Sequence, residues 1–187
     1  MKKIMMTLVA VAMATTMNAQ VYLGGTLGVK SMSCDGTSAT EFSIKPEVGY
    51  TLSDKFAVGM TIGYSTSNMA YENGAWSGKL DKSVNTFMVS PYVRYTFAKL
   101  DKVNFFCDGL VEYSNINNGY YKTNGFAIGF QPGVAVNLNE KISFVAKLGQ
   151  LTYATAKADL EGAKAVNEFN FNLSSLAALN FGLYYNF

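Results

Sequence analysis

The chain has 187 residues, of which 49% are hydrophobic, 14% are aromatic and only 15% are charged, with a net charge of +2 and no histidine. A charge balance this close to neutral argues against nucleic acid or any other strongly charged partner. The charged fraction also lies below the roughly 25% that is typical of soluble domains. This composition indicates that much of the surface meets something other than water.

The first segment has the three parts of a secretory signal peptide. A basic start (MKK) is followed by an apolar run over residues 4–14 and by the small pair NA just before Gln20. The apolar run is shorter than the about 20 residues that a membrane-spanning helix needs. We therefore expect residues 1–19 to be a cleaved signal peptide. The mature chain would then be one domain over residues 20–187, with equal numbers of basic and acidic residues.

Eight segments with period-two alternation follow. Between Phe126 and Leu138, one set of alternate positions is apolar throughout and the other is small or polar. Such alternation is typical of strands with two unlike faces. Most segments reach the about 9–11 residues of a tilted strand that crosses a bilayer. The predicted strands cover residues 21–30, 43–52, 56–65, 85–97, 103–113, 125–138, 142–153 and 175–187. The alternation is weakest in the seventh, where Val145 and Leu151 interrupt it.

The connections between these strands are alternately long and short. Short turns are predicted at residues 53–55, 98–102 and 139–141, and longer polar loops at residues 31–42, 66–84, 114–124 and 154–174. Transmembrane barrels join their strands through short periplasmic turns and longer outer loops. For an exported chain, this order predicts that both termini lie in the periplasm.

The three prolines occupy equivalent places in a faint repeat. Pro46, Pro91 and Pro132 each lie in the apolar phase of a strand that leads into a short turn. Proline cannot donate a hydrogen bond to the ladder of a sheet. We therefore expect a bulge or a missing ladder bond at each proline.

The polar phase indicates which face of the sheet points inward. A soluble barrel would fill its water-facing phase with charged residues, whereas here that phase is mostly Gly, Ala, Ser and Thr. Small side chains suit the narrow interior of a barrel of about eight strands, and the bulky apolar phase suits lipid. The sequence favours a membrane barrel, with a soluble periplasmic ligand-binding barrel as an alternative.

The last nine residues, LNFGLYYNF, alternate large apolar side chains and end in an aromatic residue. They resemble the C-terminal signal that the outer-membrane assembly machinery recognises, carried here by Phe181, Leu183, Tyr185 and Phe187. With the eight strands, the mature chain resembles the small OmpA/OmpX-like outer-membrane β-barrels. The resemblance implies an all-β, eight-stranded, antiparallel, up-and-down transmembrane barrel, present as a monomer in a Gram-negative outer membrane.

Six charged residues fall in the inward phase, three of each sign. Pairing Phe97 with Val103 would place Arg94 diagonal to Asp108, and a slip of two residues would place the two directly opposite. We interpret the six as a lumen ion network that satisfies buried charge, and a gate or ion path built from them is the alternative. The network comprises Lys45, Glu47, Arg94, Asp108, Glu112 and Lys147.

Nothing in the sequence indicates catalysis or a cofactor. Outer-membrane enzymes of similar architecture use a histidine as base or partner, and this chain has none. Cys34 and Cys107 lie in unrelated segments, so they predict neither a metal site nor a disulfide framework. Four aromatic residues in the long loops are candidates for recognition of a surface partner, or for an outer aromatic girdle. They are Tyr71, Trp76, Tyr120 and Tyr121.

Together these features predict a non-enzymatic integral outer-membrane protein. Its expected role is to support envelope integrity and to bind an extracellular partner through its loops. A narrow porin-like channel for ions or very small solutes is the alternative function.

Overall fold

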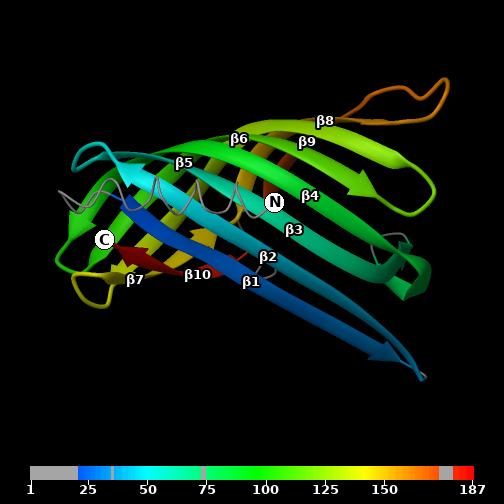
Figure 1. Cartoon of the computed structure of the whole chain (residues 1–187), viewed down its shortest axis with the longest axis horizontal. Coiled ribbons are helices and arrows are strands. Elements are labelled where there is room, and N and C mark those ends of the chain that lie inside the picture. Colours follow the sequence, from blue (N-terminus) through cyan, green and yellow to red (C-terminus); the bar gives the residue numbers. More distant parts are fainter. Residues whose placement is uncertain (1–20, 35, 73–74, 173–178) are drawn as a thin grey trace, which may run out of the picture.

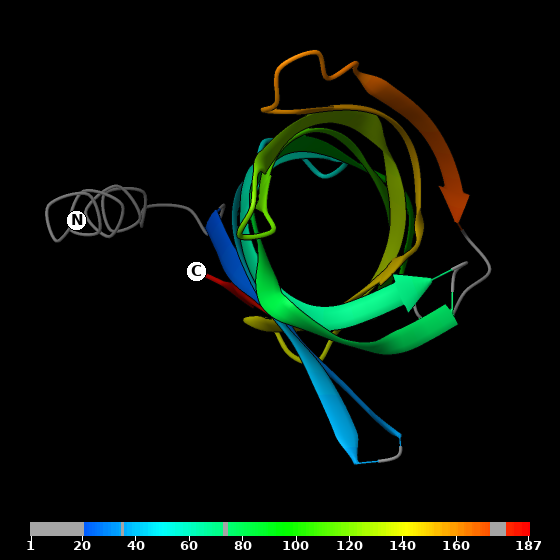
Figure 2. The same cartoon turned by 90° about the vertical axis from the view of Figure 1, so that its right-hand side faces the viewer.

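A computed structural model describes residues 21–34, 36–72, 75–172 and 179–187, so the predicted signal peptide lies outside the described residues. The described part of the chain forms ten strands and one closed barrel (Figures 1 and 2). The strands are β1 (Val21–Cys34), β2 (Thr37–Thr51), β3 (Phe56–Glu72), β4 (Ala75–Leu100), β5 (Val103–Asn117), β6 (Lys122–Asn137), β7 (Ile142–Leu148), β8 (Gln150–Ala158), β9 (Val166–Asn172) and β10 (Leu179–Asn186).

The ten strands form eight staves, where a stave is one strand position around the barrel. This confirms the predicted eight-stranded antiparallel barrel. Strands β1 to β6 pair in sequence order, and β10 pairs with both β7 and β1 to close the ring. Both β7 and β8 pair with β6, while β9 pairs with β8, so β7–β8 and β9–β10 each occupy one stave. The two described chain ends meet where the Phe187 N–H donates to the Val21 carbonyl at 3.0 Å.

A bulge at Gly149 explains why the seventh predicted strand alternated poorly. The pairing with β6 changes from Gly133–Lys147 on one side to Phe130–Leu151 on the other, a shift of one residue. Gly149 has a φ of 77°, a conformation that side chains rarely adopt. The shift moves the inward phase from Lys147 in β7 to Thr152 in β8, which reverses the sequence pattern part-way through the segment.

The predicted long loops are wrong in extent, because most of those residues continue the strands. Pairing in the β1–β2 hairpin reaches Cys34–Thr37, and pairing in the β3–β4 hairpin reaches Glu72–Ala75. In these two hairpin ends polar residues occur in both phases, so side-chain alternation fades while main-chain pairing continues. Seen along the barrel, the far end of the β1–β2 hairpin leaves the ring (Figure 2). We call this side the long-hairpin end and the opposite side the short-turn end.

Each proline lies at a gap in the ladder, as predicted. Pairing between β2 and β3 stops at Ile44–Tyr64 and resumes at Glu47–Thr61, which leaves out Pro46. The same interruption occurs at Pro91 between β4 and β5, and at Pro132 between β6 and the β7–β8 stave. The missing proline donor is thus accommodated in all three hairpins that close through a short turn.

Apolar side chains face outward and the small polar phase faces the lumen. Phe130 is 58% exposed, and Phe181 and Leu183 are also exposed, whereas the charged Glu47 and Lys147 are buried. Aromatic residues lie toward both ends of this apolar surface, which is typical of the two interfaces of a membrane barrel. The hairpin-side girdle comprises Tyr64, Phe87, Tyr113 and Phe126, and the turn-side girdle comprises Phe56, Tyr95, Phe97, Tyr185 and Phe187.

Among the described residues, no helix is long and apolar enough to cross a membrane.

Candidate functional site in the lumen

Four charged side chains meet at the middle of the lumen. Lys147 Nζ lies 2.8 Å from Glu47 Oε2 and 3.6 Å from Asp108 Oδ2, and Arg94 Nη2 lies 3.2 Å from Glu47 Oε1. Glu47 is 3% exposed and Asp108 is 1% exposed. Two cations and two carboxylates make this central cluster neutral, so no net charge is buried in the lumen.

The strongest contact in the central cluster is the fork between Arg94 and Asp108. Arg94 Nε donates to Oδ1 at 2.7 Å, and Nη2 donates to Oδ2 at 2.8 Å. The two residues are direct cross-strand partners, so the register is the one slipped by two residues and the predicted Phe97–Val103 pairing is wrong. A two-residue turn pairs Leu100 with Val103 instead, and a bulge at Phe97 shifts the register below it.

Hydroxyl groups complete the bonding of Glu47. Tyr92 donates to Oε1 at 2.5 Å, Tyr184 donates to Oε2 at 2.8 Å, and Thr61 donates to Oε2 at 3.4 Å. Tyr92 also lies 2.7 Å from the hydroxyl of Tyr22. Because the single Tyr92 proton goes to Glu47, Tyr22 must be the donor in that bond. The carboxylate is thereby joined to the first and last strands of the barrel, β1 and β10.

Aromatic rings surround the guanidinium. Arg94 Cζ lies 3.9 Å from the ring centroid of Phe106 and between 5.3 and 5.8 Å from those of Tyr22, Tyr92 and Tyr184. Cation–π attraction of this kind strengthens when the cation is removed from water. The four rings, together with the central cluster, form a plug of buried side chains across the lumen.

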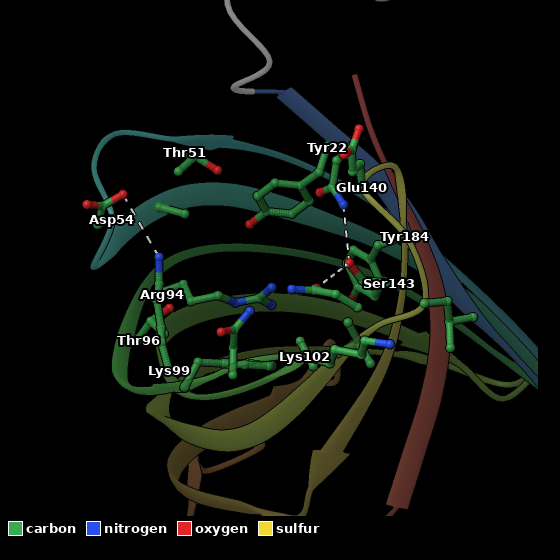
Figure 3. A pocket seen from close by; sticks show the side chains of 18 of the residues that line it. Tyr22, Thr51, Asp54, Arg94, Thr96, Lys99, Lys102, Glu140, Ser143 and Tyr184 are labelled. Atoms are coloured by element: carbon green, nitrogen blue, oxygen red, sulfur yellow. Dashed lines mark hydrogen bonds and ion pairs between the residues drawn. The ribbon is translucent and has the colours of Figure 1, made fainter.

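Cavities lie on both sides of this plug. The larger, of about 490 Å³, opens among short-turn residues, and Figure 3 shows Tyr22, Arg94 and Tyr184 among the side chains that line it. The smaller, of about 80 Å³, lies on the other side and is lined by Lys45 and Glu112 among others. Glu47 and Asp108 border only the smaller of the two. The plug therefore separates two cavities of unequal size.

Lys45 and Glu112 stand apart from the central cluster. Both are half-buried, and their charges interact across the smaller cavity. The structure thus brings four of the six predicted lumen charges into one bonded group and leaves an additional pair of opposite sign beside it.

The predicted loop residues fall into two groups. Tyr71 and Trp76 pair with each other across the far end of the β3–β4 hairpin, so they belong to strands, and their side chains lie outside the described residues. Tyr120 and Tyr121 lie in the turn between β5 and β6, where Tyr120 is 73% exposed. Only the second pair is therefore described as an exposed loop surface.

The predicted C-terminal residues all point outward. Phe181, Leu183, Tyr185 and Phe187 alternate with the lumen-facing Tyr184 and its neighbours, and each is exposed. Phe181 stacks on Phe144 with ring centroids 5.6 Å apart, and Tyr185 meets Phe187 edge-on at 5.0 Å. Their placement suits contact with lipid at the short-turn end.

The aromatic part of the plug was missed in the sequence, although a signal for it existed. Tyr22, Tyr92, Phe106 and Tyr184 are large residues in an otherwise small inward phase. Each pairs directly with a glycine of the neighbouring strand. A search for inward aromatic residues that lie opposite inward glycines would have identified all four rings of the plug.

Neither cysteine nor acidic residues form a metal site in the described part of the chain. No group of three or more His, Cys, Asp or Glu side chains is arranged there to hold an ion. Cys34, at the exposed end of β1, and Cys107, half-buried in β5, are both free thiols. The carboxylates of the central cluster are instead held by cations and hydroxyls.

Comparison with known proteins gives a family and several similar barrels. Neisserial surface protein A is 14% identical over 91% of this chain and 98% of its own, with a TM-score of 0.49. A major outer membrane protein from Thermus thermophilus is 13% identical over 90% and 98%, with a TM-score of 0.49. The Yersinia pestis outer membrane protein Ail is 11% identical over 91% and 100%, with a TM-score of 0.47. No curated protein is similar enough to count as a match.

The family model described as an outer membrane protein beta-barrel domain matches residues 4–187, nearly the whole sequence. This match agrees with the closed antiparallel barrel, its outward apolar surface and its buried lumen charges. The chain therefore belongs to the outer membrane protein beta-barrel domain family.

Proposed function

We propose that this outer-membrane barrel is a non-enzymatic, non-conducting protein that contributes to envelope integrity. The observation that carries this proposal is the plug, in which Glu47, Arg94, Asp108 and Lys147 are each at most 8% exposed. Side chains from β1, β2, β4, β5, β7 and β10 bond to one another there, so the lumen is filled where a pore would need water.

The bonding of the two carboxylates in the central cluster supports a non-enzymatic role. A general base must lie within hydrogen-bond reach of the substrate proton that it abstracts. Both oxygens of Asp108 accept from Arg94, and both oxygens of Glu47 accept from cations and hydroxyls. The chain also contains no histidine to act in their place.

A narrow channel is the alternative function, because a cavity lies on each side of the plug. Conduction would require the plug to open, because it lies between the large and small spaces. Purified protein in planar bilayers tests the choice directly. We expect no steady single-channel openings from the wild-type protein under conditions where a wide porin conducts. Steady openings of uniform size would instead assign the channel function.

The orientation of the barrel belongs to the same proposal. Cleavage of residues 1–19 and insertion through the C-terminal strand would leave both termini and the short turns in the periplasm. Phe181, Leu183, Tyr185 and Phe187 are the residues that the outer-membrane assembly machinery would recognise. The barrel would act as a monomer in outer-membrane lipid.

Binding of an extracellular partner is proposed for the turn that carries Tyr120 and Tyr121. Asn118 Oδ1 accepts both of their backbone N–H groups at 3.0 Å, which fixes the turn. Lys82 Nζ donates to the Gly119 carbonyl at 3.1 Å and lies 4.2 Å from the Tyr120 ring centroid. A turn ordered in advance loses less entropy when it binds.

Adhesion of cells that express the protein to host or environmental surfaces tests this loop role. Replacing Tyr120 and Tyr121 by Ala should lower adhesion relative to wild type, because exposed tyrosines are frequent anchors of recognition surfaces. The matched control replaces Tyr95 and Tyr185, which are exposed in the turn-side girdle at the opposite end of the barrel. Equal adhesion by all three proteins would remove the loop from the proposal.

A further inference from the structure

Asparagine side chains line the outward face immediately beyond the hairpin-side girdle. On β4, β5 and β6 the last outward aromatic residue is Phe87, Tyr113 and Phe126, respectively. The next outward residue on each strand is Asn85, Asn115 and Asn124. Asparagine is depleted in strands, so its recurrence at one height on three adjacent strands calls for a specific interaction. We call these three residues the amide row.

Hydrogen bonds with the girdle hold the amide row in place. The Tyr64 hydroxyl on β3 donates to Asn85 Oδ1 on β4 at 3.1 Å. In the same way, the Tyr113 hydroxyl on β5 donates to Asn124 Oδ1 on β6 at 2.9 Å. Asn115 Nδ2 donates to the same oxygen at 2.7 Å, since the two asparagines are direct cross-strand partners. The row is therefore a fixed array of amides.

These bonds leave both donors and acceptors facing outward. The Asn124 amide nitrogen has no partner among the described residues and can donate, while Asn115 Oδ1 and the Tyr113 oxygen can accept. A sugar hydroxyl can donate and accept at once, so it matches such a mixed array. An ionised phosphate only accepts, and it would leave the outward acceptors without partners.

The position of the amide row relative to the membrane indicates which molecules contact it. The girdle marks the edge of the hydrocarbon layer, and two residues of strand rise about 7 Å further. The amide row therefore lies at the height of the lipid headgroups. Lys157 lies directly opposite Asn124. On the described strands it is the single charged residue among the cross-strand partners of the amide row.

We propose that the amide row binds the carbohydrate headgroups of membrane lipids at the long-hairpin end of the barrel. The uncharged amides select hydroxyl-rich headgroups over phosphate. Sugar lipids would thus form an ordered ring of contacts on the β4–β6 side of the protein. This proposal depends on the membrane embedding of the barrel but not on whether its lumen conducts.

Competition between two lipids tests the proposal. The full-length mature protein in detergent receives equal amounts of digalactosyl-dioleoylglycerol and dioleoylphosphatidylcholine, whose headgroup has phosphate acceptors but no hydroxyl donor. Native mass spectrometry measures which lipid stays bound. We expect the galactolipid to be retained in preference. Replacing Asn115 and Asn124 by Ala should lower its retention about fivefold, the factor expected from loss of a hydrogen bond of ordinary strength.

The matched control replaces Asn104 and Asn137 by Ala, because these asparagines lie on the same two strands but line the cavity at the short-turn end. It should retain the galactolipid like wild type. Asn124→Asp, which keeps the side-chain shape but removes the Nδ2 donor, should also lose it. Heat-dependent migration on gels verifies that each variant folds.

Four results would overturn the proposal. Equal retention of both lipids, or retention of the galactolipid by the Ala variants, would show that the amides do not select. A preference for phosphatidylcholine that Lys157→Ala abolishes would assign the surface to phosphate. Displacement of the lipid by an equal concentration of free digalactose would show a site for soluble sugar and not for lipid.

Discussion

Tyr22 on β1 lies directly opposite Gly49 on β2, and its ring occupies the space that a side chain at residue 49 would need. The same relationship joins Tyr92 with Gly59, Phe106 with Gly133, and Tyr184 with Gly24. Each inward ring thus lies over the bare backbone of its neighbour. Four large residues fit inside a narrow barrel because four glycines face them.

Gly49→Ala should destabilise the barrel by overpacking the lumen. A methyl group at this position would overlap the Tyr22 ring, which is itself held by its bond to Tyr92. We expect a loss of about 1–3 kcal/mol in the free energy of unfolding. Reversible urea unfolding in lipid vesicles measures the change.

Gly109→Ala is the matched control for this substitution. A methyl group there would meet its nearest atom at 3.7 Å, an ordinary contact. It should leave the free energy of unfolding within about 0.5 kcal/mol of wild type. If both variants lose the same stability, glycine is required in these strands for a reason other than the ring opposite.

Asp108→Asn should cost about 3–5 kcal/mol, the usual effect of removing one partner of a buried ion pair. The substitution keeps the side-chain shape but leaves the central cluster with an uncompensated positive charge. Glu112→Gln, on the same strand and also inward, is the control, because Glu112 lies outside the bonded cluster. Urea unfolding of the two variants should therefore differ clearly.

Replacing both Arg94 and Asp108 by Leu should cost less than the sum of the two single replacements. The double variant returns the central cluster to neutrality, whereas each single variant does not. Coupling energies between residues in contact range over about 0.5–3 kcal/mol. Strict additivity in a double-mutant cycle would contradict the fork geometry of this pair.

Lysines inside and outside the plug should respond differently to the same change. Lys99 lies 4.0 Å from Asp54 with both side chains largely in solvent, so Lys99→Met should change stability by less than about 0.5 kcal/mol. Lys147→Met removes a buried partner of Glu47 and should cost several times more. Similar losses in urea unfolding for both variants would contradict a buried network.

Regular alternation allowed the sequence to predict the barrel, its inward face and the proline gaps. It failed where the main chain departs from strict alternation. The bulges at Phe97 and Gly149 each add one residue to a strand, and a one-residue shift reverses every side chain that follows. The position of a bulge depends on pairing with a distant strand, which a local pattern does not contain.

The lumen site was predicted in its charges but not in its rings. A charged residue in a slim inward phase is conspicuous in the sequence, as Arg94 and Asp108 are. A tyrosine such as Tyr184 resembles its outward neighbour Tyr185 until the opposite glycine is known. The lengths of the outer hairpins were also underestimated. Polar residues interrupt the alternation at the ends of the β1–β2 and β3–β4 hairpins, whereas β9 alternates but falls within the predicted loop at residues 154–174.

Cys34 offers a natural reporter of orientation. It is an exposed free thiol at the long-hairpin end, whereas Cys107 lies half-buried toward the short-turn end of β5, opposite Tyr95 of the turn-side girdle. A membrane-impermeant maleimide should label the wild-type protein on intact cells, and Cys34→Ser should abolish that labelling, because the reagent needs a hydrated thiolate.

In the Cys34→Ser background, Asp54→Cys places a thiol in a short turn. It should react only after the outer membrane is permeabilised. Labelling of residue 54 but not residue 34 on intact cells would invert the proposed topology.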